Sequence, residues 1–87
     1  MQLIKRRSRI INYFGIEFEI CYRAGFIATD SDGDVYWYSE LPKTDNSKAQ
    51  WFLIDDNNQG FSLLLAWVDL GDLNWKDTLK STKDITI

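Results

Sequence analysis

The chain contains no histidine, and it has only one cysteine, Cys21, and one proline, Pro42, among its 87 residues. Without histidine it cannot build a Ser-His-Asp or Cys-His triad or a Cys2His2 zinc site. A single cysteine forms neither a disulfide within the chain nor a cysteine-ligated iron–sulfur site. Because these absences remove most of the common catalytic groups, we expect a protein that is not an enzyme and that binds no cofactor or metal.

Long apolar runs are also missing. The longest, residues 63–68, has the length of a strand and falls far short of the roughly 18 to 20 residues that cross a bilayer. Residues 1–9 are basic, but the segment after them is too short and too polar for the apolar part of a signal peptide. We therefore expect one domain over residues 1–87, located in the cytoplasm and without membrane contact.

Charge is unevenly distributed along the chain, although the net charge is only -3. Of the 13 acidic residues, only Glu17 and Glu19 precede residue 24. The first part instead holds a cluster of four cations, Lys5, Arg6, Arg7 and Arg9. This asymmetry is compatible with an ordinary solvated surface, or with an acidic face that binds a basic groove on another protein.

Strand patterns dominate the chain. Residues 16–22 alternate strictly between apolar and other side chains, which predicts a half-buried strand. Residues 26–29 and 35–39 are rich in strand formers and flank an Asp-Gly pair, the residue types that tight hairpin turns favour. Residues 51–54 predict another strand, and the near-continuous apolar run at 61–68 predicts a strand buried on both faces.

Elsewhere the pattern is less regular. Residues 2–5 and 10–14 are plausible strands, residues 40–50 read as a surface loop, and 84–87 as either a short strand or a tail. Asn74 can cap a helix of about two turns within residues 71–80. The fold class predicted is mainly β (α+β): a small curled antiparallel sheet of about five to seven short strands with one short C-terminal helix.

Asp30, Asp32 and Asp34 alternate in the predicted hairpin turn and could supply oxygen ligands to calcium. An EF-hand loop, however, needs glycine at its sixth position and glutamate at its twelfth. Counted from Asp30, Gly33 is fourth and Leu41 is twelfth. We therefore interpret the segment as a hairpin turn and predict no metal site.

Tyr36, Trp37 and Tyr38 follow one another on a strand, so neighbouring rings must point to opposite faces of the sheet. Either both faces are covered, or some of these rings stay exposed and contribute to a protein-binding surface. The predicted partner-binding residues are the acids and rings of this hairpin together with the acids of a neighbouring turn. They are Asp30, Asp32, Asp34, Tyr36, Trp37, Tyr38, Asp55 and Asp56.

Residues 25–42 resemble a pattern found in many small bacteriophage and prophage proteins, in which an apolar strand, an Asp-rich turn with glycine, an aromatic strand and a proline precede a tryptophan. Trp51 fills that last place, and residues 74–79, Asn-Trp-Lys-Asp-Thr-Leu, resemble the ending of the same proteins. The resemblance implies a phage accessory protein acting in the host cytoplasm. Small proteins of that origin often block host defence proteins, including CRISPR effectors and restriction enzymes.

These observations lead to a hypothesis of a phage-encoded inhibitor that occludes a basic surface on a host defence protein. The alternative is an accessory protein that binds nucleic acid through Lys5, Arg6, Arg7 and Arg9, although the acidic remainder of the chain makes nucleic acid a less favoured partner. A component of the virion is a third option. An unpaired sheet edge would also allow a homodimer.

Overall fold

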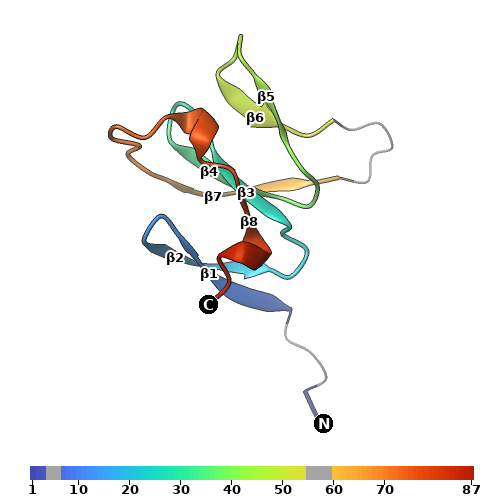
Figure 1. Ribbon diagram of the computed structural model, residues 1–87. Coiled ribbons are helices and arrows are strands. Elements are labelled where there is room, and N and C mark those ends of the chain that lie inside the picture. Colours follow the sequence, from blue (N-terminus) through green and yellow to red (C-terminus); the bar gives the residue numbers. More distant parts are fainter. Residues whose placement is uncertain (4–6, 55–59) are drawn as a thin grey trace.

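The computed structural model describes residues 1–3, 7–54 and 60–87, which form three small antiparallel sheets (Figure 1). The strands are β1 (Ser8–Tyr13), β2 (Ile16–Cys21), β3 (Phe26–Thr29), β4 (Asp34–Tyr38), β5 (Lys43–Asp45), β6 (Gln50–Phe52), β7 (Ser62–Trp67) and β8 (Lys80–Ser81). Two single-turn 3-10 helices, η1 (Trp75–Asp77) and η2 (Thr82–Asp84), flank β8. The mainly β, antiparallel class predicted from the sequence is confirmed.

The first sheet is the β1–β2 hairpin, in which Ile11 pairs with Phe18 and Tyr13 with Ile16. Its turn uses positive φ angles of 50° at Phe14 and 85° at Gly15, the backbone conformation that two-residue hairpin turns require. The backbone of residues 85–87 covers the outer side of β1, through an Asn12 N–H bond to the Ile85 carbonyl and an isolated bridge between Ile11 and Thr86.

The central sheet has the strand order β7-β4-β3-β8. β3 and β4 pair antiparallel, as the Asp-Gly turn predicted, with Ile27 opposite Trp37 and Ala28 opposite Tyr36. β7 pairs with β4 on the far side, and the register shifts between Val35 and Tyr36 because β7 carries one extra residue there. β8 closes the other edge beside Phe26 and Ile27.

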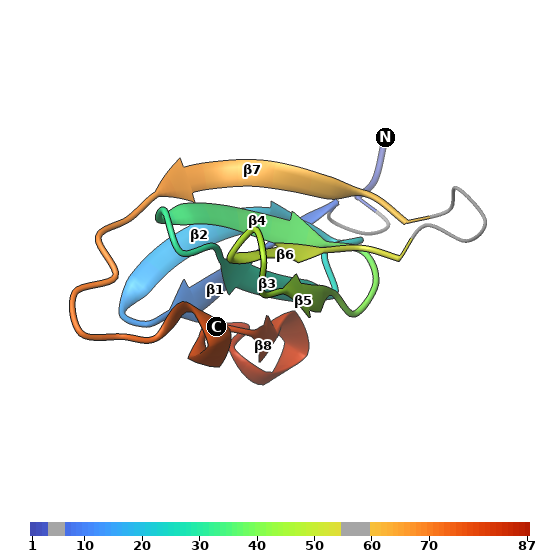
Figure 2. The ribbon, with the colours of Figure 1, turned by 90° about the horizontal axis from the view of Figure 1, so that it is seen from above.

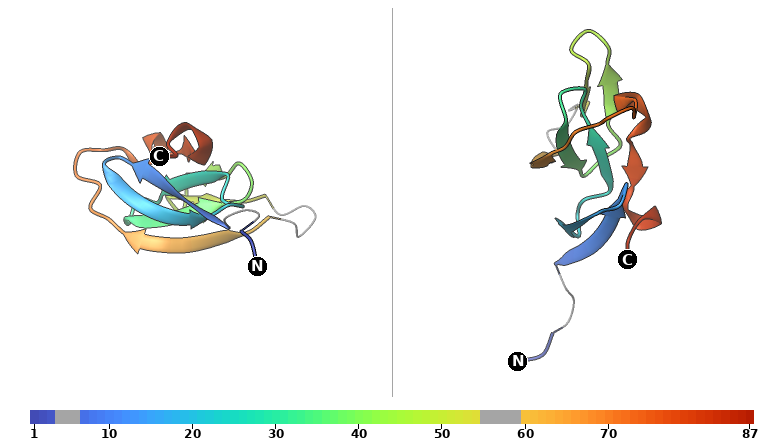
Figure 3. Two further views of the ribbon diagram at one scale, coloured as in Figure 1. Left: turned by 90° about the horizontal axis from the view of Figure 1, so that it is seen from below. Right: turned by 90° about the vertical axis from the view of Figure 1, so that its left-hand side faces the viewer.

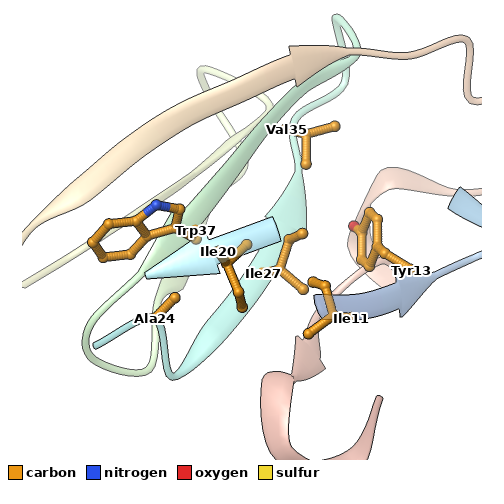
Figure 4. Close-up of a cluster of buried hydrophobic side chains, with 7 residues drawn as sticks. All are labelled: Ile11, Tyr13, Ile20, Ala24, Ile27, Val35 and Trp37. Carbon is orange, nitrogen blue, oxygen red and sulfur yellow. The ribbon is translucent and has the colours of Figure 1, made fainter. Parts of the chain in front are cut away.

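The central sheet is covered on both faces, and Figures 1 and 3 show it lying between the β1–β2 hairpin and the β5–β6 hairpin. The larger core cluster fills the space on the β1–β2 side (Figure 4). It consists of Ile11, Tyr13, Ile20, Ala24, Ile27, Val35 and Trp37. A smaller cluster on the opposite face joins Ala28, Tyr38 and Trp51, with Trp75 and Leu79 packed against it. Alternation along β3 and β4 supplies both clusters, since successive side chains point to opposite faces.

A buried polar network links the sheets to the C-terminal segment. The Tyr13 hydroxyl lies 2.8 Å from the Thr29 hydroxyl and donates to the Thr78 carbonyl at 3.0 Å. The Thr29 backbone N–H donates to the Thr78 hydroxyl at 2.9 Å. Burial raises the pKa of Tyr13, against the smaller opposing effect of these two threonines. The network satisfies backbone groups of β3 that lie beyond the end of β8.

The C-terminal helix predicted within residues 71–80 is wrong in type and length. Asn74 caps as expected, accepting from the Lys76 N–H, but only one 3-10 turn follows. The Thr78 hydroxyl then donates to the Trp75 carbonyl at 2.7 Å, so that carbonyl is satisfied without further helix and the chain continues into β8. Within the described segments no α-helix forms, and no helix has the length and apolar character needed to span a membrane.

Three further expectations need correction. Residues 40–50 are not an unstructured loop, because β5 and β6 form a hairpin around Ala49, which has a φ of 52°. Gln2 and Leu3 lie outside any strand, whereas residues 4 and 5 lie outside the described residues. The strand predicted at 61–68 exists as β7, but it is an exposed edge strand instead of one buried on both faces.

Candidate partner-binding site

The acidic turn between β3 and β4 is held in one conformation by backbone hydrogen bonds. The Gly33 N–H donates to the Asp30 carbonyl, and the Asp30 N–H donates to the Asp34 carbonyl, both at 2.9 Å. Gly33 has a φ of 92°, and the Asp32 carboxylate accepts from the Asp34 N–H at 3.1 Å. Carboxylate oxygens of Asp30, Asp32 and Asp34 consequently lie within 4.8 Å of one another.

Asp30 is a structural member of this trio. Its side chain is only 7% exposed, and its carboxylate accepts from the Trp51 backbone N–H at 2.7 Å, which ties the turn to β6. Burial raises the pKa of Asp30, and the neighbouring charges of Asp32 and Asp34 add to that effect, while the Trp51 N–H opposes it. The expectation that Asp30 forms part of an exposed contact surface is therefore wrong.

Oxygen donors gathered in this way are the ligands that calcium prefers. One oxygen of Asp30 is already engaged by Trp51, and Asp32 accepts from the backbone of its own turn. The first bond ties the turn to β6 and the second belongs to the hairpin turn itself, so both carboxylates have a structural role without an ion. We assign no metal to it.

Asp32 is exposed and Asp34 is half-buried, and Asp32 borders an open hollow of about 630 Å³ between the turn and the segment that follows β7. Asp69 lines the opposite side of this hollow, with Leu70, Leu73 and Trp75 supplying apolar wall. Among the residues described, no lysine or arginine forms an ion pair with Asp32 or Asp69. We call Asp32, Asp34 and Asp69 the acidic rim.

Two of the three consecutive aromatic residues are buried. Trp37 is 6% exposed and belongs to the larger core cluster, and Tyr38 is 3% exposed and belongs to the smaller one. Burial raises the pKa of Tyr38 well above its usual value. Of the two alternatives, the one with both strand faces covered is confirmed at Trp37 and Tyr38, so the prediction that these two rings take part in partner binding is wrong.

Tyr36 differs from its two neighbours because it is half-buried and its ring lies 6.1 Å from that of Tyr38. It borders a second hollow, of about 360 Å³, together with Trp51 and Phe52 of β6. Partial burial raises the pKa of Tyr36, with Asp34 the largest of the charges that add to the effect. Of the three predicted rings, this one combines access to a partner with a place beside the acidic rim.

The remaining predicted residues divide between described and undescribed segments. Asp55 and Asp56 lie outside the described residues, as do Lys5 and Arg6. Arg7 is exposed. Arg9 is half-buried, and its guanidinium donates to the Ala24 carbonyl at 2.8 Å and to the Thr82 hydroxyl at 2.9 Å. The expectation that Arg9 is a free phosphate contact is therefore wrong, because it holds the chain near η2 against the β2–β3 turn.

Sequence reasoning missed Asp69 and the exposed apolar residues of β7. Asp69 is 37 positions from Asp32 in the chain, and the two line one hollow because Gly33 and Val68 are hydrogen-bonded, with the Val68 N–H donating to the Gly33 carbonyl at 2.9 Å. The run of Leu63, Leu64 and Leu65 was informative about strand formation but not about exposure. Its lack of charge gave no sign that β7 would lie at an edge.

Comparison of the chain with models of protein families, with curated proteins and with solved structures finds no match. The fold and site define a small mainly β protein that presents an acidic rim beside a half-buried aromatic ring.

Proposed function

We propose that this chain is a phage-encoded, non-enzymatic protein that binds a host defence protein, of the CRISPR or restriction type, and inhibits it by occupying a basic functional surface. The acidic rim is the observation that carries the proposal. Asp32 and Asp69 face a common hollow with Asp34 beside them, and no described cation neutralises them. The phage origin comes from the sequence resemblance of residues 25–42 and 74–79.

Electrostatics explain why such a rim favours a basic partner. Like charges held close together create a negative potential that attracts lysine and arginine side chains and raises the rate of association. A groove that has evolved to hold nucleic acid is basic, so an acidic surface can compete for it. Tyr36 and the apolar wall at Leu70 and Leu73 would supply contact area once water is expelled.

The inventory of reactive side chains supports a binding role over a catalytic one. The chain has no histidine, and its one cysteine, Cys21, lies half-buried in β2. The raised pKa of Asp30 is accounted for by its burial and its neighbours, and its carboxylate supports the β6 backbone. We therefore assign no catalytic residue.

Nucleic-acid binding by the basic cluster receives less support. Such binding needs several cations free to neutralise phosphates. Arg9 already donates within the protein, which leaves Arg7 as the exposed cation of this cluster among the described residues. We keep this function as an outcome of the experiment below.

A tagged pull-down from a defence-competent bacterial host, with and without nuclease treatment, tests the proposal. We expect one protein partner that resists nuclease and whose activity the chain inhibits. Loss of every partner on nuclease treatment would instead support a nucleic-acid role.

A charge variant then tests the surface. Asp32→Asn with Asp69→Asn removes two negative charges and leaves an amide oxygen for the turn hydrogen bonds at each position. We expect affinity for the purified partner to fall by about ten-fold or more, and binding by the unmodified chain to weaken as salt rises. The matched control, Glu17→Gln with Glu40→Gln, removes two exposed charges elsewhere and should bind normally. Equal affinity of both double variants would show that the acidic rim is not the contact surface.

A further inference from the structure

β7 is an unusual sheet edge. It forms one border of the central sheet, and Figure 2 shows it along one side of the molecule, with β8 and the 3-10 helices on the opposite side. Its six residues, Ser-Leu-Leu-Leu-Ala-Trp, carry no charge and no proline. Along the described part of the chain, no strand pairs with the outer side of β7. One row of its backbone N–H and C=O groups is therefore available to another strand.

The side chains of β7 are as unprotected as its backbone. Leu63 is 54% exposed, Leu64 is 42% exposed and Trp67 is 78% exposed. Leu63 lies opposite Trp37 and Leu64 opposite Tyr36, so the exposed leucines belong to both faces of the sheet. A strand added along β7 would cover apolar surface on both faces as well as forming backbone hydrogen bonds.

The other sheet edges carry the features by which proteins normally prevent strand addition. β2 has Glu17 and Glu19, and the outer side of β1 is covered by residues 85–87. β8 has two residues and β5 and β6 have three each. β7 has only the bulge produced by its extra residue, and apolar side chains flank that bulge on both sides.

We propose that β7 binds β7 of a second copy of this chain, as an antiparallel pair about a two-fold axis. Any strand can pair antiparallel with its own copy, because the two-fold axis presents the same edge on both sides. Such a pair brings the Trp67 end of one strand beside the Ser62 end of the other. The inference does not depend on the identity of the host target.

Charges at the two ends of β7 are complementary for this arrangement. Asp34 of β4 is paired with Trp67, and Asp69 follows Trp67 two residues later. At the other end, the exposed Arg23 guanidinium lies 5.9 Å from the centre of the Phe61 ring, and the exposed Glu40 lies beside Gly60, so that end carries charges of both signs. An antiparallel pair places the acidic end of each copy near Arg23 of the other, whereas a parallel pair would place like charges together. This distribution of charge favours a second copy as the occupant and antiparallel as its direction, because antiparallel pairing keeps the two acidic ends apart and gives each an arginine neighbour.

Measurement of the molar mass by light scattering on a sizing column tests the proposal. We expect a species of twice 10.2 kDa at concentrations up to about 1 mM, within the range of weak homodimers. Leu63→Lys should convert it to monomer, because it places a cation on each copy at the pairing edge. Leu41→Lys is the matched control, since Leu41 is 55% exposed and lies outside β7. An unmodified chain that is monomeric throughout this range would overturn the proposal, as would a Leu63→Lys dimer.

A charge exchange tests the direction. Arg23→Asp should weaken the dimer at least about ten-fold, and adding Asp69→Arg to it should restore the dimer. Circular dichroism of each variant confirms that it remains folded. A double variant no stronger than Arg23→Asp alone would contradict the antiparallel arrangement. Because both substitutions are read out as self-association without a host protein, their failure is distinct from failure of the proposed inhibitor function.

Discussion

Replacing Thr78 by valine would test whether the buried polar network holds the C-terminal segment to the central sheet. The substitution preserves the shape of the side chain and replaces its hydroxyl with a methyl group. That hydroxyl accepts from the Thr29 N–H at 2.9 Å and donates to the Trp75 carbonyl at 2.7 Å, and Thr78 itself is fully buried. No water can replace the lost oxygen without opening the fold.

The expected loss of unfolding free energy depends on which hydrogen bonds remain for each group that the Thr78 hydroxyl contacts. The Trp75 carbonyl keeps bonds from the Thr78 backbone N–H and the Trp51 indole N–H, both at 3.3 Å, so losing the hydroxyl there costs about 1 kcal/mol. The Thr29 N–H keeps no partner and is buried, which costs about 1 to 3 kcal/mol. The free energy of unfolding should therefore fall by about 2 to 4 kcal/mol. That is a large part of the total expected for 87 residues, about 4 to 13 kcal/mol.

Urea denaturation followed by tryptophan fluorescence measures this change, because Trp51 and Trp75 pack beside the network with ring centres 6.0 Å apart. Thr78→Ser keeps the hydroxyl and should retain most of the stability. Thr44→Val, on an exposed strand position, should change stability by less than about 0.5 kcal/mol. The reasoning is refuted if Thr78→Val unfolds at the same urea concentration as the unmodified chain, or if Thr78→Ser is equally destabilised.

Two further predictions concern the acidic turn. Gly33→Ala should destabilise the fold by about 2 to 3 kcal/mol or more, because φ is 92° there and the new Cβ would lie 2.2 Å from the Val68 carbonyl oxygen. Gly71→Ala, at a φ of 58° with open space around it, should cost only about 1 kcal/mol, and equal losses in thermal unfolding would contradict the role of the Val68 contact. Asp30→Asn should be more stable than the unmodified chain at pH 7, because burial raises the pKa of Asp30 and an amide can still accept from Trp51 without carrying a charge. Because the pKa of Asp30 is higher in the folded state, its ionisation destabilises the fold. This loss of folding stability is absent below the unfolded-state pKa of about 3.9, and it grows as pH rises from there through the folded-state pKa. The advantage of the variant should therefore disappear in unfolding curves recorded below about pH 4, and an advantage that is the same at all pH values would contradict this explanation.

Local sequence signals predicted strand β2 and the β3–β4 hairpin well. The alternation in residues 16–22 corresponds to β2, and the Asp-Gly pair corresponds to the turn between β3 and β4. Both signals depend on neighbours within a few residues, through side-chain direction and turn geometry. Trp75 and Leu79 both pack on the smaller core cluster, although the segment between them is not the α-helix that the Asn74 cap predicted.

The exposure of individual residues could not be predicted in the same way. The leucines of β7 and the aromatic residues of β4 are equally apolar in the sequence, yet Trp37 is buried and Leu63 is exposed. The difference depends on which strand lies inside the sheet and which lies at its edge, and that order depends on pairings distant in the chain. The candidate site shares this limitation: Asp32 was identified locally, whereas Asp69 joins it through the contact between Gly33 and Val68.

The backbone of residues 85–87 against β1 has a consequence for how the protein is made. The Ile87 N–H donates to the Ile10 carbonyl at 2.9 Å, so the outer edge of β1 is covered only after residues 85–87 have been synthesised. The β1–β2 hairpin can form early from local contacts, but its outer edge then stays open until residues 85–87 have been synthesised. Translation order and folding order therefore diverge at β1, and a nascent chain that has not yet reached residue 85 should expose an edge that residues 85–87 later cover.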